Sequence, residues 1–182
     1  PRDYGTSPVR YPIRYRQGHF SLAAPLGFEE GGAVYKEWIR DDFPRMIVVT
    51  LQHPTPYFDD SYGVNSVNNG PYGDAIMQEL LPEVEKRFRA IREPYARVLS
   101  GGSTGGWEAL ALQLFHPDFF GGTWSDCPDP VEFSNVEGID IYKDSNAFYK
   151  VFEWGRREPT VNTRETDGSI RLTSEQRNHF EL

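Results

Sequence analysis

The chain has 182 residues, of which 25% are charged and 14% aromatic, and this length and composition predict a folded protein rather than a disordered one. The net charge of −8 argues against a nucleic-acid partner or an anionic membrane surface, because both require clusters of Lys and Arg. The single cysteine, Cys127, excludes an internal disulfide framework and a zinc site built from several cysteines.

Two strands are expected in the first third of the chain. Residues 11–16 alternate apolar and polar side chains, as in a strand with one covered face. Residues 46–51 form a nearly continuous apolar run rich in β-branched side chains, which is typical of a buried parallel strand. The next segment, residues 53–73, is a long loop rich in Pro, Asp, Asn, Gly and Tyr, and loops of this length are often functional.

Helices and strands alternate in the middle of the chain. Apolar side chains recur every three or four positions from about residue 74 to residue 91, which predicts an amphipathic helix with a kink or break at Pro82. A strand over residues 96–100, a helix over residues 104–115 and a strand over residues 119–125 follow. This order predicts the α/β class, with a mostly parallel sheet flanked by helices.

Other charged or oxygen-rich segments carry no predicted site. The charged residues between positions 83 and 92 fit the solvated face of a helix, with some pairing at i,i+4. Residues 59–63 and 65–70 are rich in oxygen ligands, but they lack the residue order and the terminal Glu of an EF-hand. The metalloprotease and phosphate-loop motifs are also missing from the sequence, so we expect no metal ion and no organic cofactor.

The segment Gly101-Gly102-Ser103-Thr104-Gly105 fits the pattern G-x-S-x-G between a predicted strand and a predicted helix. A strand that turns at once into a helix forces its central residue, Ser103, into strained backbone angles and lifts the hydroxyl out of the sheet. Gly101 and Gly105 avoid clashes inside such a turn. The N–H of Thr104 then lies where it would stabilise an oxyanion, helped by the helix dipole. The alternative interpretation is a glycine-rich turn with an incidental serine.

A nucleophilic serine needs a histidine base that is oriented by an acid. Only two histidines follow Ser103. His116 ends the helix that begins beside Ser103, about 18 Å away, and is expected to interact with the last helix carbonyls. His179, in the polar tail, is therefore the candidate base. Asp126 and Asp129 follow a strand and are candidate acids, with turn formation as the alternative interpretation of both.

The end of the first strand is the second place where site residues are expected. Gly18, His19 and Phe20 follow that strand, and a backbone N–H there would be the second oxyanion donor. His19 is alternatively a rim residue that touches substrate, and His53 is expected to be structural or to face substrate. Trp107 and the aromatic side chains of the long loop are expected to line a cleft for a sugar or an aromatic acyl group.

Several segments form a pattern more specific than G-x-S-x-G alone. They are residues 11–13, 61–66, 69–74, 79–82, 100–107 and 116–120. This pattern resembles the esterase family of the α/β-hydrolases, whose members include S-formylglutathione hydrolases, enterochelin esterases, feruloyl esterases and mycolyltransferases. The resemblance implies an α/β-hydrolase sheet with Ser103 as nucleophile, the Thr104 amide as one oxyanion donor and the loop at Gly18-His19 as the other. Many relatives carry His-Gly at that loop, where this chain has the reverse order.

Members of this family continue with further strands that carry the catalytic Asp and His, and residues 134–182 contain no matching segment. We therefore expect residues 1–150 to be the N-terminal part of an α/β-hydrolase domain that is incomplete at its C-terminus. Residues 151–182 are expected to be a polar, irregular lid or insertion. Two alternatives stay open: a compact enzyme that uses Asp126 or Asp129 with His179, and a protein that has lost catalysis.

The expected function is hydrolysis of carboxylic esters by a serine esterase, through an acyl-enzyme at Ser103. The alternatives are a non-catalytic carbohydrate- or ligand-binding module on the same fold, and acyl transfer to an alcohol. The expected partners are a small-molecule ester and either the rest of a longer chain or a second copy. No apolar run is long enough to span a membrane, and no signal peptide is visible, so a soluble protein is expected and its compartment, cytoplasm or exterior, stays open.

Overall fold

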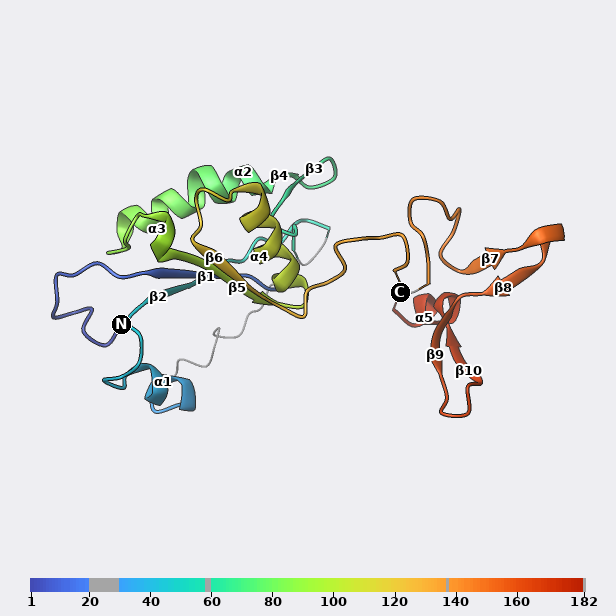
Figure 1. Cartoon of the computed structure of the whole chain (residues 1–182), viewed down its shortest axis with the longest axis horizontal. Helices are drawn as coiled ribbons and strands as arrows, with labels where there is room; N and C mark the ends of the chain where they lie inside the picture. Colours follow the sequence, from blue (N-terminus) through green and yellow to red (C-terminus); the bar gives the residue numbers. More distant parts are fainter. Residues whose placement is uncertain (20–29, 58–59, 137, 182) are drawn as a thin grey trace. The chain divides into compact units, whose positions relative to one another are not determined.

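The computed structural model describes residues 1–19, 30–57, 60–136 and 138–181 (Figure 1). Two compact units make up the chain, Pro1–Asp129 and Pro130–Leu182. The division between the two compact units falls after Asp129, whereas the sequence analysis places its boundary after residue 150. None of the helices in the described part of the chain is long and apolar enough to cross a membrane.

A four-stranded parallel sheet forms the centre of the first unit. Its strands are β1 (Ile13–Arg16), β2 (Ile47–Thr50), β5 (Arg97–Gly102) and β6 (Gly122–Asp126), in the order β2-β1-β5-β6. The prediction of an α/β fold with a mostly parallel sheet flanked by helices is confirmed. Strand β2 is half-buried rather than buried, because it lies at the sheet edge. Strand β6 begins later than expected, because the Phe119 N–H donates to the His116 carbonyl in a turn.

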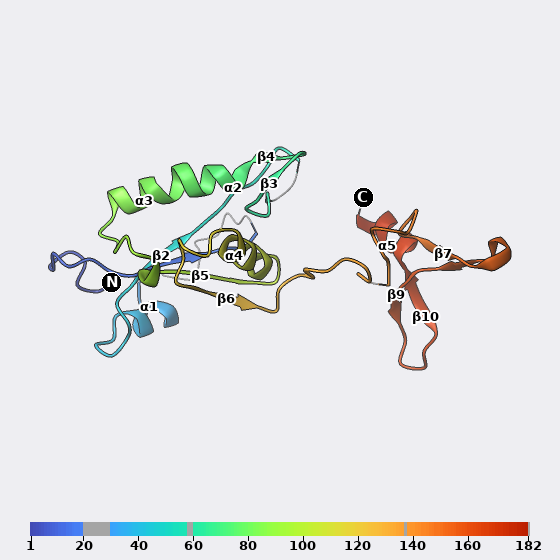
Figure 2. The ribbon, with the colours of Figure 1, turned by 45° about the horizontal axis from the view of Figure 1, so that its top comes forward.

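Helices cover one face of this sheet, as Figures 1 and 2 show. The first helical segment runs through α2 (Tyr72–Asp74), a π-helical stretch (Ala75–Leu80) and α3 (Leu81–Arg87), and the second is α4 (Thr104–Phe115). Pro82 lies in the first turn of α3, where its missing N–H costs little, and the wider π-helical turn precedes it. The helix ends before residue 91, because residues 89 and 91 hydrogen-bond with Tyr11 instead.

The core of the first unit lies between the sheet and these helices. Its members come from β1, β5, the helical segments and the turns beside them. They are Ile13, Tyr15, Leu51, Ile76, Leu81, Ala90, Leu99, Ala109, Leu112 and Phe120. The buried strand residues alternate along β1 with half-buried arginines, as the predicted one-sided strand requires.

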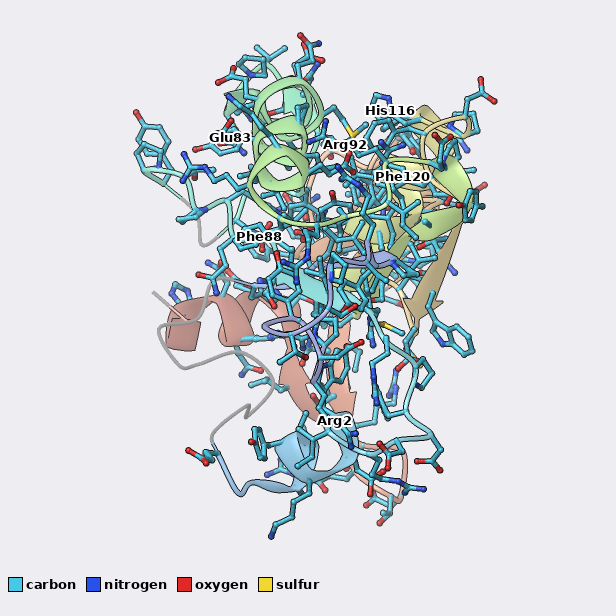
Figure 3. All side chains as sticks on the ribbon, turned by 90° about the vertical axis from the view of Figure 1, so that its left-hand side faces the viewer. Arg2, Glu83, Phe88, Arg92, His116 and Phe120 are labelled. Atoms are coloured by element: carbon cyan, nitrogen blue, oxygen red, sulfur yellow. The ribbon has the colours of Figure 1, made fainter. Side chains whose placement is uncertain are left out.

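The charged stretch of α3 has two different faces. Glu83 lies at the surface (Figure 3). It accepts a hydrogen bond from Arg87 at i,i+4, as predicted. Glu85 is buried, which corrects the prediction that this stretch is only a solvated face. Its carboxylate accepts two hydrogen bonds from Arg97, of 2.6 and 2.9 Å, and one of 2.9 Å from the Tyr15 hydroxyl. Glu85 therefore joins α3 to both central strands through charge-assisted bonds.

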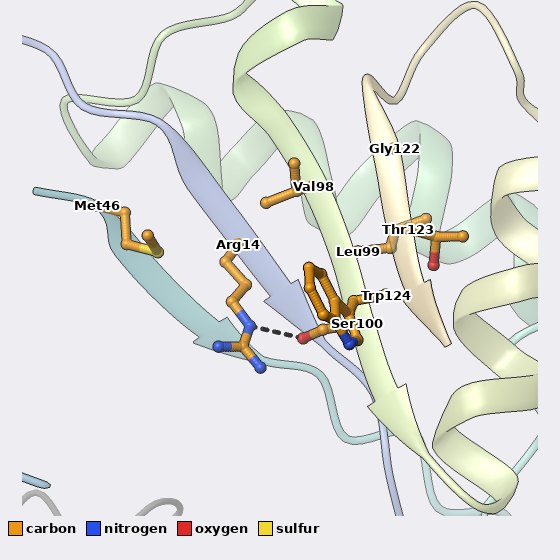
Figure 4. Close-up of a pocket in the computed structure, with 8 residues that line it drawn as sticks. All are labelled: Arg14, Met46, Val98, Leu99, Ser100, Gly122, Thr123 and Trp124. Atoms are coloured by element: carbon orange, nitrogen blue, oxygen red, sulfur yellow. Dashed lines mark hydrogen bonds between the residues drawn. The ribbon is translucent and has the colours of Figure 1, made fainter. Parts of the chain in front are cut away.

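The opposite side of the sheet contains an open pocket of about 540 Å³ (Figure 4). Arg14 crosses it from β1 and donates a hydrogen bond of 2.7 Å to the Ser100 hydroxyl on β5. Trp124 of β6 also lines this pocket and is 79% exposed. A short helix that the sequence did not predict, α1 (Ala33–Trp38), precedes β2, and none of its side chains is buried.

The second unit has regular elements where the sequence predicts an irregular segment. Strands β7 (Tyr149–Val151) and β8 (Arg157–Pro159) pair antiparallel, as do β9 (Val161–Arg164) and β10 (Ile170–Thr173). Helix α5 (Ser174–Glu181) follows them. Glycines with positive φ, at positions 155 and 168, form the two hairpin turns. Among the described residues, the buried apolar cluster contains none from this unit. Its strands and helix therefore lack the apolar periodicity by which such elements are predicted from sequence.

Candidate active site

Ser103 is the single residue between the end of β5 and the start of α4. Its backbone has φ +54° and ψ −125°, a conformation that side chains rarely adopt and that costs free energy of folding. The turn is possible only because glycines flank it. A Cβ at Gly101 would lie 2.0 Å from the Gly105 carbonyl oxygen, and a Cβ at Gly105 would lie 2.4 Å from the Gln17 carbonyl oxygen.

Backbone hydrogen bonds hold the strained turn in place. The Ser103 N–H donates to the Asp126 carbonyl at 3.0 Å, which ties the turn to the end of β6. The Ser103 carbonyl accepts from Gly106 at 2.9 Å and from Trp107 at 3.1 Å, which begins the helix. Asp126 therefore contacts the turn through its backbone, while the residue itself is exposed.

Asp129 is the predicted acid that lies closest to the serine. Its carboxylate accepts a hydrogen bond of 3.3 Å from the Ser103 hydroxyl and one of 2.7 Å from the Thr104 hydroxyl. In a Ser-His-acid triad the acid contacts the histidine rather than the serine. The direct contact of Asp129 with Ser103 thus differs from the arrangement that its predicted role requires.

The two backbone segments that are predicted to hold an oxyanion lie side by side. The Gln17 N–H donates to the Ser100 carbonyl at 2.8 Å, so the chain after β1 continues beside β5. Gly105 packs on Gln17 and Gly18, with only 2.9 Å between its ideal Cβ position and the Gly18 Cα. Thr104 begins α4, and the first N–H groups of a helix have no partner inside the helix. Phe20, the third residue predicted here, lies outside the described residues.

A group of buried polar side chains lies beneath this junction. His19 Nδ1 lies 2.7 Å from the Asp60 carboxylate. The ligand atoms of Asp60, His53 and Glu108 all lie within 4.8 Å of one another, and all three residues are buried. His53 binds the Ser61 backbone and hydroxyl through Nδ1, at 3.3 and 3.1 Å. We call Asp60, Glu108 and His53 the buried polar cluster.

Glu108 is an acid on the apolar face of α4 with 0% exposure. Burial raises the pKa of its carboxyl to about 8, and the negative charge of Asp60 contributes to the rise. Burial also lowers the pKa of His53. The cluster therefore favours a neutral Glu108 and a neutral His53 around the Asp60 carboxylate.

Stability should depend on the protonation of Glu108. Because folding raises its pKa from 4.5 to about 8, the unfolded chain releases a proton that the folded chain keeps within this pH window. The contribution of Glu108 to the free energy of unfolding therefore falls as pH rises through the window, by about 1.4 kcal/mol per pH unit. Glu108→Gln should remove this slope, as measured by urea unfolding of both proteins at several pH values. The lowered pKa of His53 also makes stability depend on pH, but this contribution is common to wild type and Glu108→Gln and cancels in the comparison. Equal slopes in the two proteins would mean that Glu108 is ionised in the folded state.

An aromatic pair lies beside the serine turn, and its part in a substrate cleft stays a prediction. The rings of Trp107 and Tyr62 meet edge to face, with 5.4 Å between centroids. Trp107 also lines a groove of about 360 Å³ that is open to solvent and includes Phe115 and His116. Tyr62 has φ +58° and comes from the long loop, which also contains the short antiparallel strands β3 (Asn65–Ser66) and β4 (Gly70–Pro71).

The structure brings some of the predicted site residues together and leaves others apart. Ser103, Thr104 and Asp129 are in contact. His116 ends α4, where its N–H donates to the Leu112 carbonyl, in agreement with a helix-end role. His179 lies on α5 in the second unit, so its pairing with Ser103 stays a prediction.

Asp60 and Glu108 are site residues that the sequence did not predict. Asp60 belongs to the oxygen-rich loop, whose residue order lacks the EF-hand pattern and indicates no other site. Glu108 had a usable signal, because it lies four residues after Thr104 and four before Leu112, both of which are buried. A carboxylate on the apolar face of a helix is rare without a partner.

The parallel sheet, its helical cover and the strand–serine–helix turn define an α/β-hydrolase-like protein. The chain matches the family model described as "Esterase: Putative esterase" over residues 13–165, and it therefore belongs to this esterase family. Among solved structures it is similar to a ferulic acid esterase, with 23% identity, a TM-score of 0.57 and coverage of 72% of this chain and 53% of that one. This likeness shows the fold, and the chain spans about half the length of that structure. No curated protein matches the chain.

Proposed function

We propose that this protein hydrolyses carboxylic esters through an acyl-enzyme formed at Ser103. The observation that carries the proposal is the position of Ser103, alone between β5 and α4 with φ +54° and flanked by glycines that admit no side chain. A strained serine at the C-terminal end of a parallel strand is the arrangement that exposes a hydroxyl to a substrate carbonyl. Membership of an esterase family agrees with this chemistry.

In the proposed reaction the Ser103 oxygen attacks the ester carbonyl carbon while a histidine takes the hydroxyl proton. The carbonyl oxygen becomes an oxyanion, which the amides of Thr104 and His19 stabilise. The histidine then protonates the departing alcohol, and water attacks the acyl-enzyme by the same route to release the acid. We assign the base to His179 with Asp129 or Asp126, or to a histidine and an acid of a longer chain.

The ester acyl group is proposed to be aromatic. The similar solved structure is described as a ferulic acid esterase. Trp107, one helical turn after Ser103, and Phe115 both line a solvent-open groove. A planar aromatic acid would fit between such rings, since aromatic pairs favour edge-to-face and offset contacts.

A ligand-binding module without catalysis is the second candidate. It is favoured by the direct contact between Asp129 and the Ser103 hydroxyl, where a catalytic site would have an imidazole. In that case the groove beside Trp107 would bind an aromatic ligand without chemical change.

Labelling by a fluorophosphonate probe tests the proposal. We expect covalent modification of Ser103 in the full-length protein, mapped by mass spectrometry, and none in Ser103→Ala. Release of ferulate from its methyl ester should be lost in the same variant. An intact protein that binds the ester but neither reacts with the probe nor releases acid would support the binding module instead.

A further inference from the structure

Three segments that are distant in the sequence meet at the Asp60 carboxylate. One oxygen of Asp60 accepts a hydrogen bond of 3.0 Å from the Tyr62 N–H, and the other lies 2.7 Å from His19 Nδ1. Glu108 approaches from α4, within 4.8 Å of the same carboxylate. Asp60 is 2% exposed, whereas the His19 side chain is about half exposed. A buried acid thus holds a histidine that lies at the molecular surface.

Glu108 carries the proton that makes this arrangement stable. Neither Glu108 oxygen, nor the Asp60 oxygen beside His19, has a hydrogen-bond partner of good geometry among the residues that the structure describes. Two ionised carboxylates in such a site would repel each other and lose their solvation. A protonated Glu108 can donate to Asp60 instead, and burial together with Asp60 raises its pKa accordingly. Asp129 on the β6 side adds to this rise, and burial lowers the pKa of His53 on the β2 side.

A proton explains the buried polar cluster better than a metal ion does. His53 Nδ1 accepts a hydrogen bond of 3.3 Å from the Ser61 backbone N–H. In a neutral imidazole the ring hydrogen is then on Nε2. That Nε2 faces the Gln17 side-chain oxygen at 3.2 Å and Glu108 at 3.7 Å. Both nitrogens are engaged, and neither presents a lone pair to a cation.

We propose that Asp60, supported by Glu108, is a positioning residue that fixes His19 and thereby the backbone of residues 17–19 as an oxyanion-binding segment. This inference rests on the proposed esterase function. Gln17, the first residue of the segment, is held by its hydrogen bond to Ser100 of β5, and the residues after it have left the sheet. The Gly105 turn packs against Gln17 and Gly18 on one side, and the contact with the Asp60 carboxylate anchors the next residue, His19.

The proposal assigns a function to the order Gly18-His19. With His19 after the glycine, its imidazole reaches the buried carboxylate, and its own N–H belongs to the predicted oxyanion segment. An anchor on the side chain therefore restricts the amide of the same residue. A displacement of about 1 Å in such a donor can cost about 100-fold in rate.

Asp60→Asn is the principal test, because an amide cannot replace both interactions of the carboxylate. The amide oxygen of the variant can face either the Tyr62 N–H or His19 Nδ1. The amide NH₂ group then faces the other of these two nitrogens, to which it cannot act as an acceptor. We expect His19 to change from the Nδ1–H to the Nε2–H tautomer, measured by ¹⁵N NMR of the imidazole. The turnover number for ferulate methyl ester should fall by about 10- to 100-fold with little change in KM.

Two substitutions at Glu108 test the proton. Glu108→Gln has the shape and the donor of the protonated acid, and we expect it to keep the His19 tautomer and a turnover number within about threefold of wild type. Glu108→Leu has no donor, and we expect it to resemble Asp60→Asn. The matched control is Ser61→Ala, which removes the hydroxyl that binds His53 and leaves the His19 contact in place. Circular dichroism and urea unfolding establish that each variant is folded.

The outcomes separate this inference from the proposed function. A tautomer change in Asp60→Asn without labelling of Ser103 in wild type would confirm the anchor and contradict the esterase. If Asp60→Asn is labelled at Ser103 and hydrolyses ferulate methyl ester with an unchanged turnover number, the positioning role of Asp60 is overturned. If Glu108→Gln loses activity and its His19 is no longer in the Nδ1–H tautomer, the site needs an ionised carboxylate at Glu108, as a bound metal ion would. That result would overturn the inference that Glu108 is protonated and donates to Asp60.

Discussion

Alanine at Gly105 is expected to lower the rate of fluorophosphonate labelling at Ser103 by at least about 100-fold, because the added Cβ displaces backbone rather than a side chain. Its ideal position lies 2.4 Å from the Gln17 carbonyl oxygen and 2.9 Å from the Gly18 Cα. The turn and the segment after β1 must separate, and these are the two segments proposed to share the oxyanion. The same clash should lower the free energy of unfolding by about 1–3 kcal/mol. Labelling kinetics and urea unfolding measure the two effects.

Gly102→Ala is the matched control for this prediction. Gly102 belongs to the same turn and precedes the same serine, but its Cβ would lie 3.8 Å from the nearest atom, the Asp126 carbonyl oxygen. That distance is ordinary van der Waals contact, so labelling and stability should change little. Similar labelling in Gly102→Ala and Gly105→Ala would contradict the proposal that close approach of the two segments creates the site.

The local pattern around Ser103 was sufficient to predict its surroundings. Glycines at positions 101 and 105, a short apolar strand before them and a helix after them leave few conformations for the central residue. The structure has the strand, the single-residue turn and the helix in that order. Short-range sterics decide all three, and such effects can be read from neighbouring residues. Near Pro82 the sequence predicts a kink or break within one helix, and the structure has a π-helical stretch directly before α3 at this position.

The contacts of Asp60 and Glu108 could not be predicted in the same way. These residues are 48 positions apart, and their proximity depends on how the long loop returns over α4. Asp129 was predicted from its place after a strand, yet its contact with the serine hydroxyl depends on the path of a loop that no periodicity describes. Hydrophobic patterns predict elements and their buried faces, whereas polar contacts between loops depend on tertiary structure.

Loss of the Glu85 carboxylate should cost about 3–5 kcal/mol of the free energy of unfolding, because it leaves the buried Arg97 guanidinium without its partner. Two hydrogen bonds from Arg97 and one from the Tyr15 hydroxyl end at this carboxylate. The bond to Glu85 raises the pKa of Arg97. Without Glu85 the guanidinium is a buried charge with no opposite charge beside it, and this costs solvation free energy. Glu85→Ala tests this prediction by urea unfolding followed by far-UV circular dichroism.

Glu83→Ala provides the comparison, since it removes a carboxylate from the same helix two residues earlier. Glu83 pairs with Arg87 at 2.6 Å, but both side chains are exposed, so the expected loss is far smaller than that of Glu85→Ala. Added salt should weaken the Glu83 contribution and leave that of Glu85 nearly unchanged, because solvent ions screen exposed pairs far more than buried ones. Equal losses in the two variants would contradict the role of Glu85 in joining α3 to β1 and β5. A large loss only at Glu85 would instead establish that the scaffold beneath the serine turn depends on a buried ion pair.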